Sequence, residues 1–79
     1  MKGARILVVD DDPAILRIVR RSLEFAGYNV EALDCGDRVT ERVETFGPDV
    51  ILLDLVLPDA DGIELTRKLN HGSASIIVV

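Results

Sequence analysis

Acidic residues directly follow two short apolar runs, and their type and spacing could support chemistry. Asp10, Asp11 and Asp12 come after the run 6–9, and Asp54 comes after the run 50–53. Carboxylates gathered in one place repel one another unless a cation lies between them. Mg²⁺ is a hard ion that prefers oxygen ligands, so it would relieve that repulsion. The pattern therefore indicates a divalent-cation site, provided that the two runs end side by side.

The two apolar runs have the character of buried strands. Four consecutive aliphatic residues bounded by polar ones are typical of a strand covered on both faces of a parallel sheet. We therefore predict strands over 5–9 and 50–53. Open α/β sheets bind their ligands outside the carboxyl ends of the strands, and this is where the acidic residues stand.

The remaining elements alternate between helices and strands. Asp12 as N-cap and Pro13 as first helical residue predict a helix that runs to about residue 26, with Gly27 in the left-handed conformation after it. An edge strand is expected over 28–33, a short helix from Val39 to Phe46, a loop over 55–62, a helix over 63–69 and a fourth strand over 76–79. The first helix has a broad apolar face, made of Ile15, Leu16, Ile18, Val19, Leu23, Phe25 and Ala26.

This β-α-β-α-β-α-β order predicts a three-layer, doubly wound parallel sheet with helices on both faces. We expect the strand order 2-1-3-4, in which the first and third strands are neighbours, so that Asp11 and Asp54 can approach one another and supply two ligands to Mg²⁺. A backbone carbonyl in the loop after Asp54 could add a ligand, and Asp10 could hold a metal-bound water. Four strands make the fold incomplete, because doubly wound domains usually have more.

Composition narrows the class of protein. The 79 residues suffice for one domain, 1–79, and 48% of them are hydrophobic. A net charge of −5 argues against a nucleic-acid surface, and no run of apolar residues is long enough to span a membrane. Cys35 is the only cysteine and no signal peptide is recognisable, so we expect a cytoplasmic location.

Two segments carry a resemblance to a known family. Residues 6–13 (ILVVDDDP) and 49–62 (DVILLDLVLPDADG) resemble the response-regulator receiver domain of two-component signalling, whose fold is flavodoxin-like. The resemblance implies that Asp54 is the phosphoacceptor and that Asp11 binds Mg²⁺ directly. It also implies that Asp10 acts mainly through water and that the Val56 carbonyl is a backbone ligand. Pro58 and Gly62 would then shape the loop beside the phosphate.

The resemblance also implies partners. A sensor histidine kinase or a phosphotransfer protein would donate the phosphoryl group from a phosphohistidine, and the receiver would be a signalling module and not a turnover enzyme. The first helix would contribute to docking, which makes Arg17, Arg20 and Arg21 candidate contacts. Receivers carry a Ser or Thr after the fourth strand and a Lys after the fifth, and the sequence ends before both positions. We therefore expect the amino-terminal portion of a receiver, without the fourth helix, fifth strand and fifth helix. We expect this portion to bind the metal more readily than to switch conformation on phosphorylation.

Two other functions stay open at this point. Missing elements would leave part of the sheet around Ile6, Val8, Ile51 and Leu53 uncovered and the fourth strand as an open edge, so the chain would self-associate or bind a partner without switching. A metal-dependent phosphatase-like enzyme would also place an aspartate after a strand. Such enzymes have a second aspartate two residues further on, where this chain has Val56.

Overall fold

Four parallel strands form the central sheet, and the predicted strand order is confirmed. The computed structural model describes residues 3–54, 56–57, 60–69, 72 and 74–78. Within these ranges the sheet order is β2-β1-β3-β6, which is the predicted 2-1-3-4. Its strands are β1 (Arg5–Val9), β2 (Asn29–Leu33), β3 (Val50–Leu53) and β6 (Ser75–Val78).

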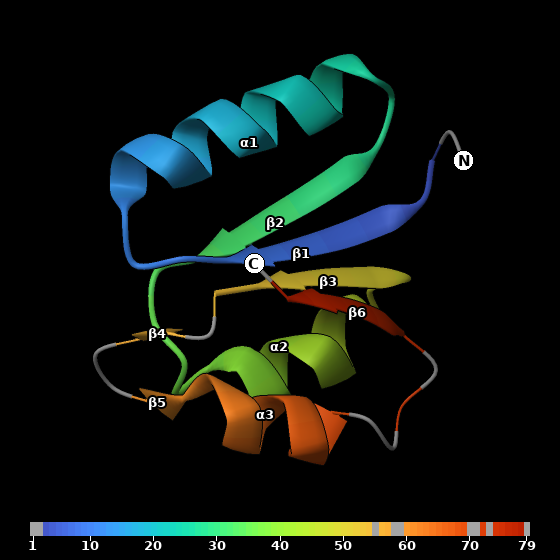
Figure 1. Ribbon diagram of the computed structural model, residues 1–79. Helices are drawn as coiled ribbons and strands as arrows, with labels where there is room; N and C mark the ends of the chain where they lie inside the picture. Colours follow the sequence, from blue (N-terminus) through green and yellow to red (C-terminus); the bar gives the residue numbers. More distant parts are fainter. Residues whose placement is uncertain (1–2, 55, 58–59, 70–71, 73, 79) are drawn as a thin grey trace.

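Helices cover both faces of this sheet, as predicted (Figure 1). The helix α1 (Pro13–Phe25) packs on one face, and α2 (Val39–Phe46) and α3 (Gly62–Leu69) pack on the other. Because side chains alternate along a strand, neighbouring residues of β1 and β3 serve opposite faces. Leu7 and Ile51 face α2 and α3, whereas Ile6 and Val8 face α1. None of the helices within the described ranges has the length and apolar character needed to cross a bilayer.

Glycines end the first two helices. Gly27 follows the α1 cap residue Ala26 with a φ of 100°, and Gly47 ends α2 with a φ of 62°. These positive angles are costly for residues with a Cβ and are readily adopted by glycine. Gly27 was predicted to occupy this conformation, and that prediction is confirmed.

The broad apolar face predicted for α1 is narrower in the structure. Leu16 is buried, and Val19 and Leu23 pack beside it, but Ile18 is 65% exposed and Phe25 is 95% exposed. At about 100° per residue, Phe25 lies about 180° from Leu16 around the helix axis. The apolar residues of α1 therefore include several that do not meet the sheet.

The sheet side chains that no helix covers are not the ones predicted. Ile6, Val8, Ile51 and Leu53 are all buried, so the prediction for them was wrong. The uncovered positions lie further along the α1 face, where Val50 and Leu52 are half-buried and Ile77 is 52% exposed. Ile77 pairs with Leu52 across the β3–β6 register, which places both side chains on this face.

The segment after β3 was predicted to be a loop and contains a small antiparallel pair. Strands β4 (Val56–Leu57) and β5 (Ala60–Asp61) pair in the register Val56 to Asp61 and Leu57 to Ala60. The helix α3 begins directly after β5, at Gly62. Leu55, Pro58 and Asp59 lie outside the described residues, as does His71.

Candidate metal centre

The neighbouring strands β1 and β3 end side by side, and an aspartate follows each of them. The β1–β3 register pairs Val9 with Leu53, so Asp10 and Asp54 are the next residues on adjacent strands. The Asp54 N–H donates to the Val9 carbonyl at 3.0 Å, and the Asp10 N–H donates to the Leu33 carbonyl at 3.1 Å. Sheet hydrogen bonds therefore fix the backbone of both residues.

The turn after β1 is organised by its own aspartates. The Asp12 N–H donates to Oδ1 of Asp10 at 3.0 Å, which is an Asx-turn that orients the Asp10 side chain. Oδ1 of Asp12 accepts from the N–H groups of Ala14 at 2.9 Å and Ile15 at 3.4 Å. Asp12 is thus the N-cap of α1, as predicted, and Pro13 is the first helical residue. The Asx-turn was missed in the sequence, although an aspartate two residues before a helix cap is a usable signal for it.

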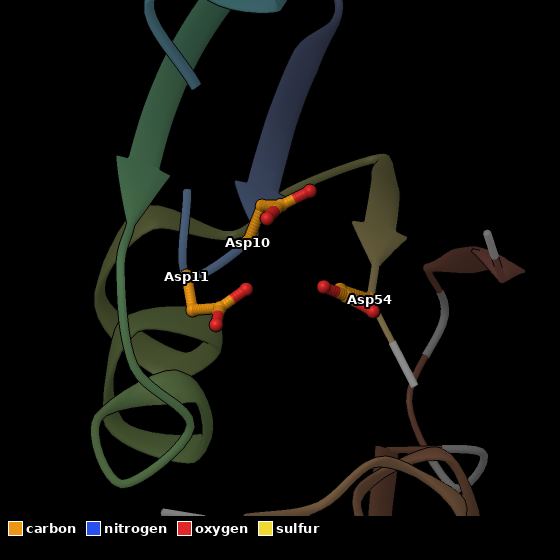
Figure 2. A group of neighbouring side chains, drawn as sticks. All are labelled: Asp10, Asp11 and Asp54. Atoms are coloured by element: carbon orange, nitrogen blue, oxygen red, sulfur yellow. The ribbon is translucent and has the colours of Figure 1, made fainter. Parts of the chain in front are cut away.

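The carboxylates of Asp10, Asp11 and Asp54 converge. One oxygen from each lies within 4.8 Å of the others. Figure 2 shows the side chains of Asp11 and Asp54 pointing toward one another, with Asp10 beside them at the end of β1. Asp11 is exposed, whereas Asp10 and Asp54 are half-buried. The three residues named from the sequence therefore do lie together.

This donor set fits a small divalent cation. An octahedral Mg²⁺ site with bonds of about 2.0–2.1 Å separates its ligand oxygens by about 2.9 Å when adjacent and about 4.1 Å when opposite. The three carboxylate oxygens lie within 4.8 Å of one another, which is a slightly wider limit than these distances. Modest side-chain rotations would bring the oxygens to the spacing of a Mg²⁺ site. All three donors are hard carboxylate oxygens, which favours Mg²⁺ over softer metals.

Val56 lies in β4, two residues after Asp54 and beyond Leu55, which is outside the described residues. Its role as a backbone ligand stays a prediction. Gly62 is the first residue of α3, and Pro58 is outside the described ranges.

Cys35 lies away from this cluster, in the turn between β2 and α2. Its thiol donates to Oδ1 of Asp37 at 2.8 Å.

Comparisons with known proteins agree on one family. The family described as "Response regulator receiver domain" matches residues 6–79. The chain is 40% identical over 67 residues to the transcriptional regulatory protein TrcR of Mycobacterium tuberculosis, covering 85% of this chain and 26% of that protein. It is 46% identical over 68 residues to the response regulator MprA of Mycobacterium ulcerans, covering 86% of this chain and 29% of that protein.

A solved structure shows the same fold. The BeF3-activated N-terminal receiver domain of Klebsiella pneumoniae RstA superposes with a TM-score of 0.89 at 32% identity, over 94% of this chain and 64% of that one. The chain thus spans less than a third of the length of these two curated relatives and slightly under two thirds of this receiver structure.

Proposed function

The chain belongs to the response-regulator receiver domain family, and from this premise we propose that it accepts a phosphoryl group on Asp54 with the help of Mg²⁺. The donor would be a phosphohistidine of a sensor histidine kinase or a phosphotransfer protein in the cytoplasm. The observation that carries the proposal is the convergence of three carboxylates from two adjacent strand ends. Receivers are signalling modules, so we expect one phosphorylation event and not repeated turnover.

We assign the role of nucleophile to Asp54 because its position matches the phosphoacceptor of the receiver motif. It follows Leu53, which is fully buried, and its N–H is bonded to β1, so its position is held by the core. In the proposed step a carboxylate oxygen of Asp54 attacks the phosphorus and forms the acyl phosphate. The bond from phosphorus to the histidine nitrogen breaks, and the imidazole keeps the electron pair.

The other two aspartates would hold the cation together with a carboxylate oxygen of Asp54. Asp11 would bind Mg²⁺ directly, and Asp10, already oriented by the Asp12 N–H, would act mainly through water. The Val56 carbonyl would be a further ligand. When bound, Mg²⁺ neutralises charge on the oxygens of the transferred phosphoryl group.

The test is a comparison of intact masses. We expect the chain to gain the mass of one phosphoryl group when incubated with Mg²⁺ and acetyl phosphate, and to gain none with EDTA. Asp54→Asn should abolish the gain, whereas Asp49→Asn, which changes an aspartate at the opposite end of β3, should retain it. A gain that survives Asp54→Asn would refute the assignment, and continuous phosphate release would favour a hydrolase.

Metal binding can be tested separately. Mg²⁺ titrations followed by amide chemical shifts should show changes at 10–12 and 54. Asp11→Asn should weaken binding by at least about tenfold, and Asp10→Asn by less, because an indirect contact contributes less than a direct one. A larger effect of Asp10→Asn would reverse the two assigned roles.

A second candidate function is self-association of the chain without a conformational switch driven by phosphorylation. The exposed side chains Ile77 and Val78, on the sheet-edge strand β6, favour it. Sedimentation velocity across micromolar concentrations tests this, since a monomer at every concentration would exclude self-association through β6.

A further inference from the structure

One face of the sheet is only partly covered by the described helices. On this face α1 packs against β1 and β2, whereas α2 and α3 share the other face (Figure 1). Beside α1, the strands β3 and β6 present Val50 and Leu52, which are half-buried, and Ser75 and Ile77, which are exposed. We call these four side chains the β3–β6 strip. The strip carries no charge, and its exposed members show that no helix within the described ranges covers it completely.

The outward side of α1 is apolar as well. At about 100° per residue, Ala14, Ile18 and Phe25 fall within about 40° of one another, opposite the buried Leu16. Ala14 is exposed, and the side chains of Ile18 and Phe25 are among the most exposed large apolar ones described. We call these three residues the α1 ridge. A helix on the surface normally presents polar side chains here, so the ridge is a second apolar surface that calls for a partner.

The charged side of α1 does not separate the ridge from the strip. It faces β2, where a cavity beside Ala32 is lined by Arg17, Arg20, Arg21 and Glu24. Ile15 and Ser22 are exposed on the opposite side of the helix, which faces β3 and β6. The ridge and the strip therefore border one another without a charged side chain of α1 between them.

We propose that two copies of the chain form a two-fold dimer, in which the α1 ridge of each copy packs on the β3–β6 strip of the other. A two-fold axis between ridge and strip, parallel to both, places each surface over its counterpart, so the contact is isologous and closed. The two α1 helices then lie side by side between the two sheets, and Ile15 and Ser22 of each helix face the other helix. This dimer deepens the second candidate function, self-association, and rests on it, but it uses a face of β6 and not its free edge.

The two surfaces match in size and chemistry. The ridge rises about 16 Å from Ala14 to Phe25, and β3 and β6, with four residues each, span about 13 Å. A packed helix occupies about 10 Å of width, which is about twice the spacing of neighbouring strands, so two strands leave room for one helix. Arg21 borders the ridge on its outer side, where the long side chain keeps its charge in solvent.

The first test compares two isoleucines of similar exposure on different helices. Ile18 is 65% exposed on α1, and Ile63 is 61% exposed on α3, across the sheet. The interface is close to the lower limit of about 1,000 Å² for specific association, so we expect a dissociation constant in the micromolar range by sedimentation velocity. Ile18→Glu and Phe25→Glu should each weaken the dimer at least about tenfold, because each buries a charge on an apolar strip.

Ile63→Glu is the matched control. It should change the dissociation constant less than about twofold, because Ile63 lies outside the interface. Circular dichroism should show that all three variants are folded, since each replaces a side chain that is already exposed. The phosphoryl gain of Ile18→Glu from acetyl phosphate should equal that of the unchanged chain, because the carboxylate cluster shares no residue with the interface. Failure of phosphorylation is therefore distinguishable from failure of dimerisation.

Cross-linking separates this dimer from the pairing of two β6 edges. In a Cys35→Ser background, a chain with Ile18→Cys and a chain with Ile77→Cys are mixed and treated with a short bismaleimide. We expect links between positions 18 and 77, whereas edge pairing across a two-fold axis would link 77 to 77. Links from 77 to 77 without links from 18 to 77 would overturn the proposal. A monomer at millimolar concentration, or an equal weakening by Ile63→Glu, would also overturn it.

Discussion

The two faces of the sheet are packed unequally. The face under α2 and α3 holds the side chains that are fully excluded from solvent, among them Leu7, Ile51 and Leu53. Among the described residues, the cluster between α1 and the sheet contains four buried residues. The cover that α1 provides ends before β3 and β6, where Leu52 is half-buried and Ile77 is exposed. The same strands supply both faces, so the difference arises from the helices above them and not from strand composition.

This asymmetry bears on the carboxylate cluster. We call the face under α2 and α3 the closed face, and the face under α1 the open face. Asp54 follows Leu53, whose side chain is on the closed face, and Asp10 follows Val9, which is buried on the same side. The backbone that positions the two aspartates is therefore anchored in the better packed half of the core. Side chains on the open face can therefore be changed without moving the carboxylate cluster. Substitutions on each face test this comparison.

Adjacent residues of β3 give the largest expected contrast. Ile51→Ala should lower the free energy of unfolding by about 2–5 kcal/mol, because it leaves a cavity in the closed face. Leu52→Ala removes a half-buried side chain from the open face and should cost about 1–2 kcal/mol. Urea denaturation of both variants measures the difference. Equal losses would show that the two faces contribute alike.

The N-caps of α1 and α2 offer a second, smaller contrast. Asp12→Ala should cost about 1 kcal/mol, because the Asp12 carboxylate accepts two N–H groups of α1. Arg38 occupies the cap position of α2 without a side-chain cap bond, so Arg38→Ala should change stability by less than about 0.5 kcal/mol. Thermal unfolding followed by circular dichroism compares them. A loss at Arg38 as large as at Asp12 would contradict this account of the caps.

The smallest expected change in stability is at the edge strand β6. Ile77→Ser should alter the free energy of unfolding by less than about 0.5 kcal/mol, because its side chain is already 52% exposed. The same substitution should reduce any self-association seen by sedimentation velocity. Ile76→Ser, on the closed face of the same strand, is the control and should be clearly more destabilising. If Ile77→Ser were the more costly change, the open face would be packed after all.

The strands and the helix starts could be predicted because their signals are local. The run Val50–Leu53 matches the observed β3, and Asp12-Pro13 marks the start of α1. The width of the packed face of α1 could not be predicted, since it depends on how far the sheet extends beneath the helix. Phe25 shows this, because it is apolar in sequence yet points away from the sheet. The β4–β5 pair was missed because two-residue strands have no periodicity to detect.

The candidate site was partly predictable for the same reason. An aspartate directly after a buried strand is visible in the sequence, and the strand order then places Asp10, Asp11 and Asp54 together.

The most direct test of the central claim is to identify the phosphorylated residue chemically. Borohydride reduces an acyl phosphate to an alcohol, which converts a phosphorylated aspartate into homoserine. After incubation with Mg²⁺ and acetyl phosphate, reduction and proteolysis, tandem mass spectrometry should find homoserine at position 54 and at neither 10 nor 11. Homoserine at position 10 or 11, or its absence from the whole chain, would contradict the assignment of Asp54 as the phosphoacceptor.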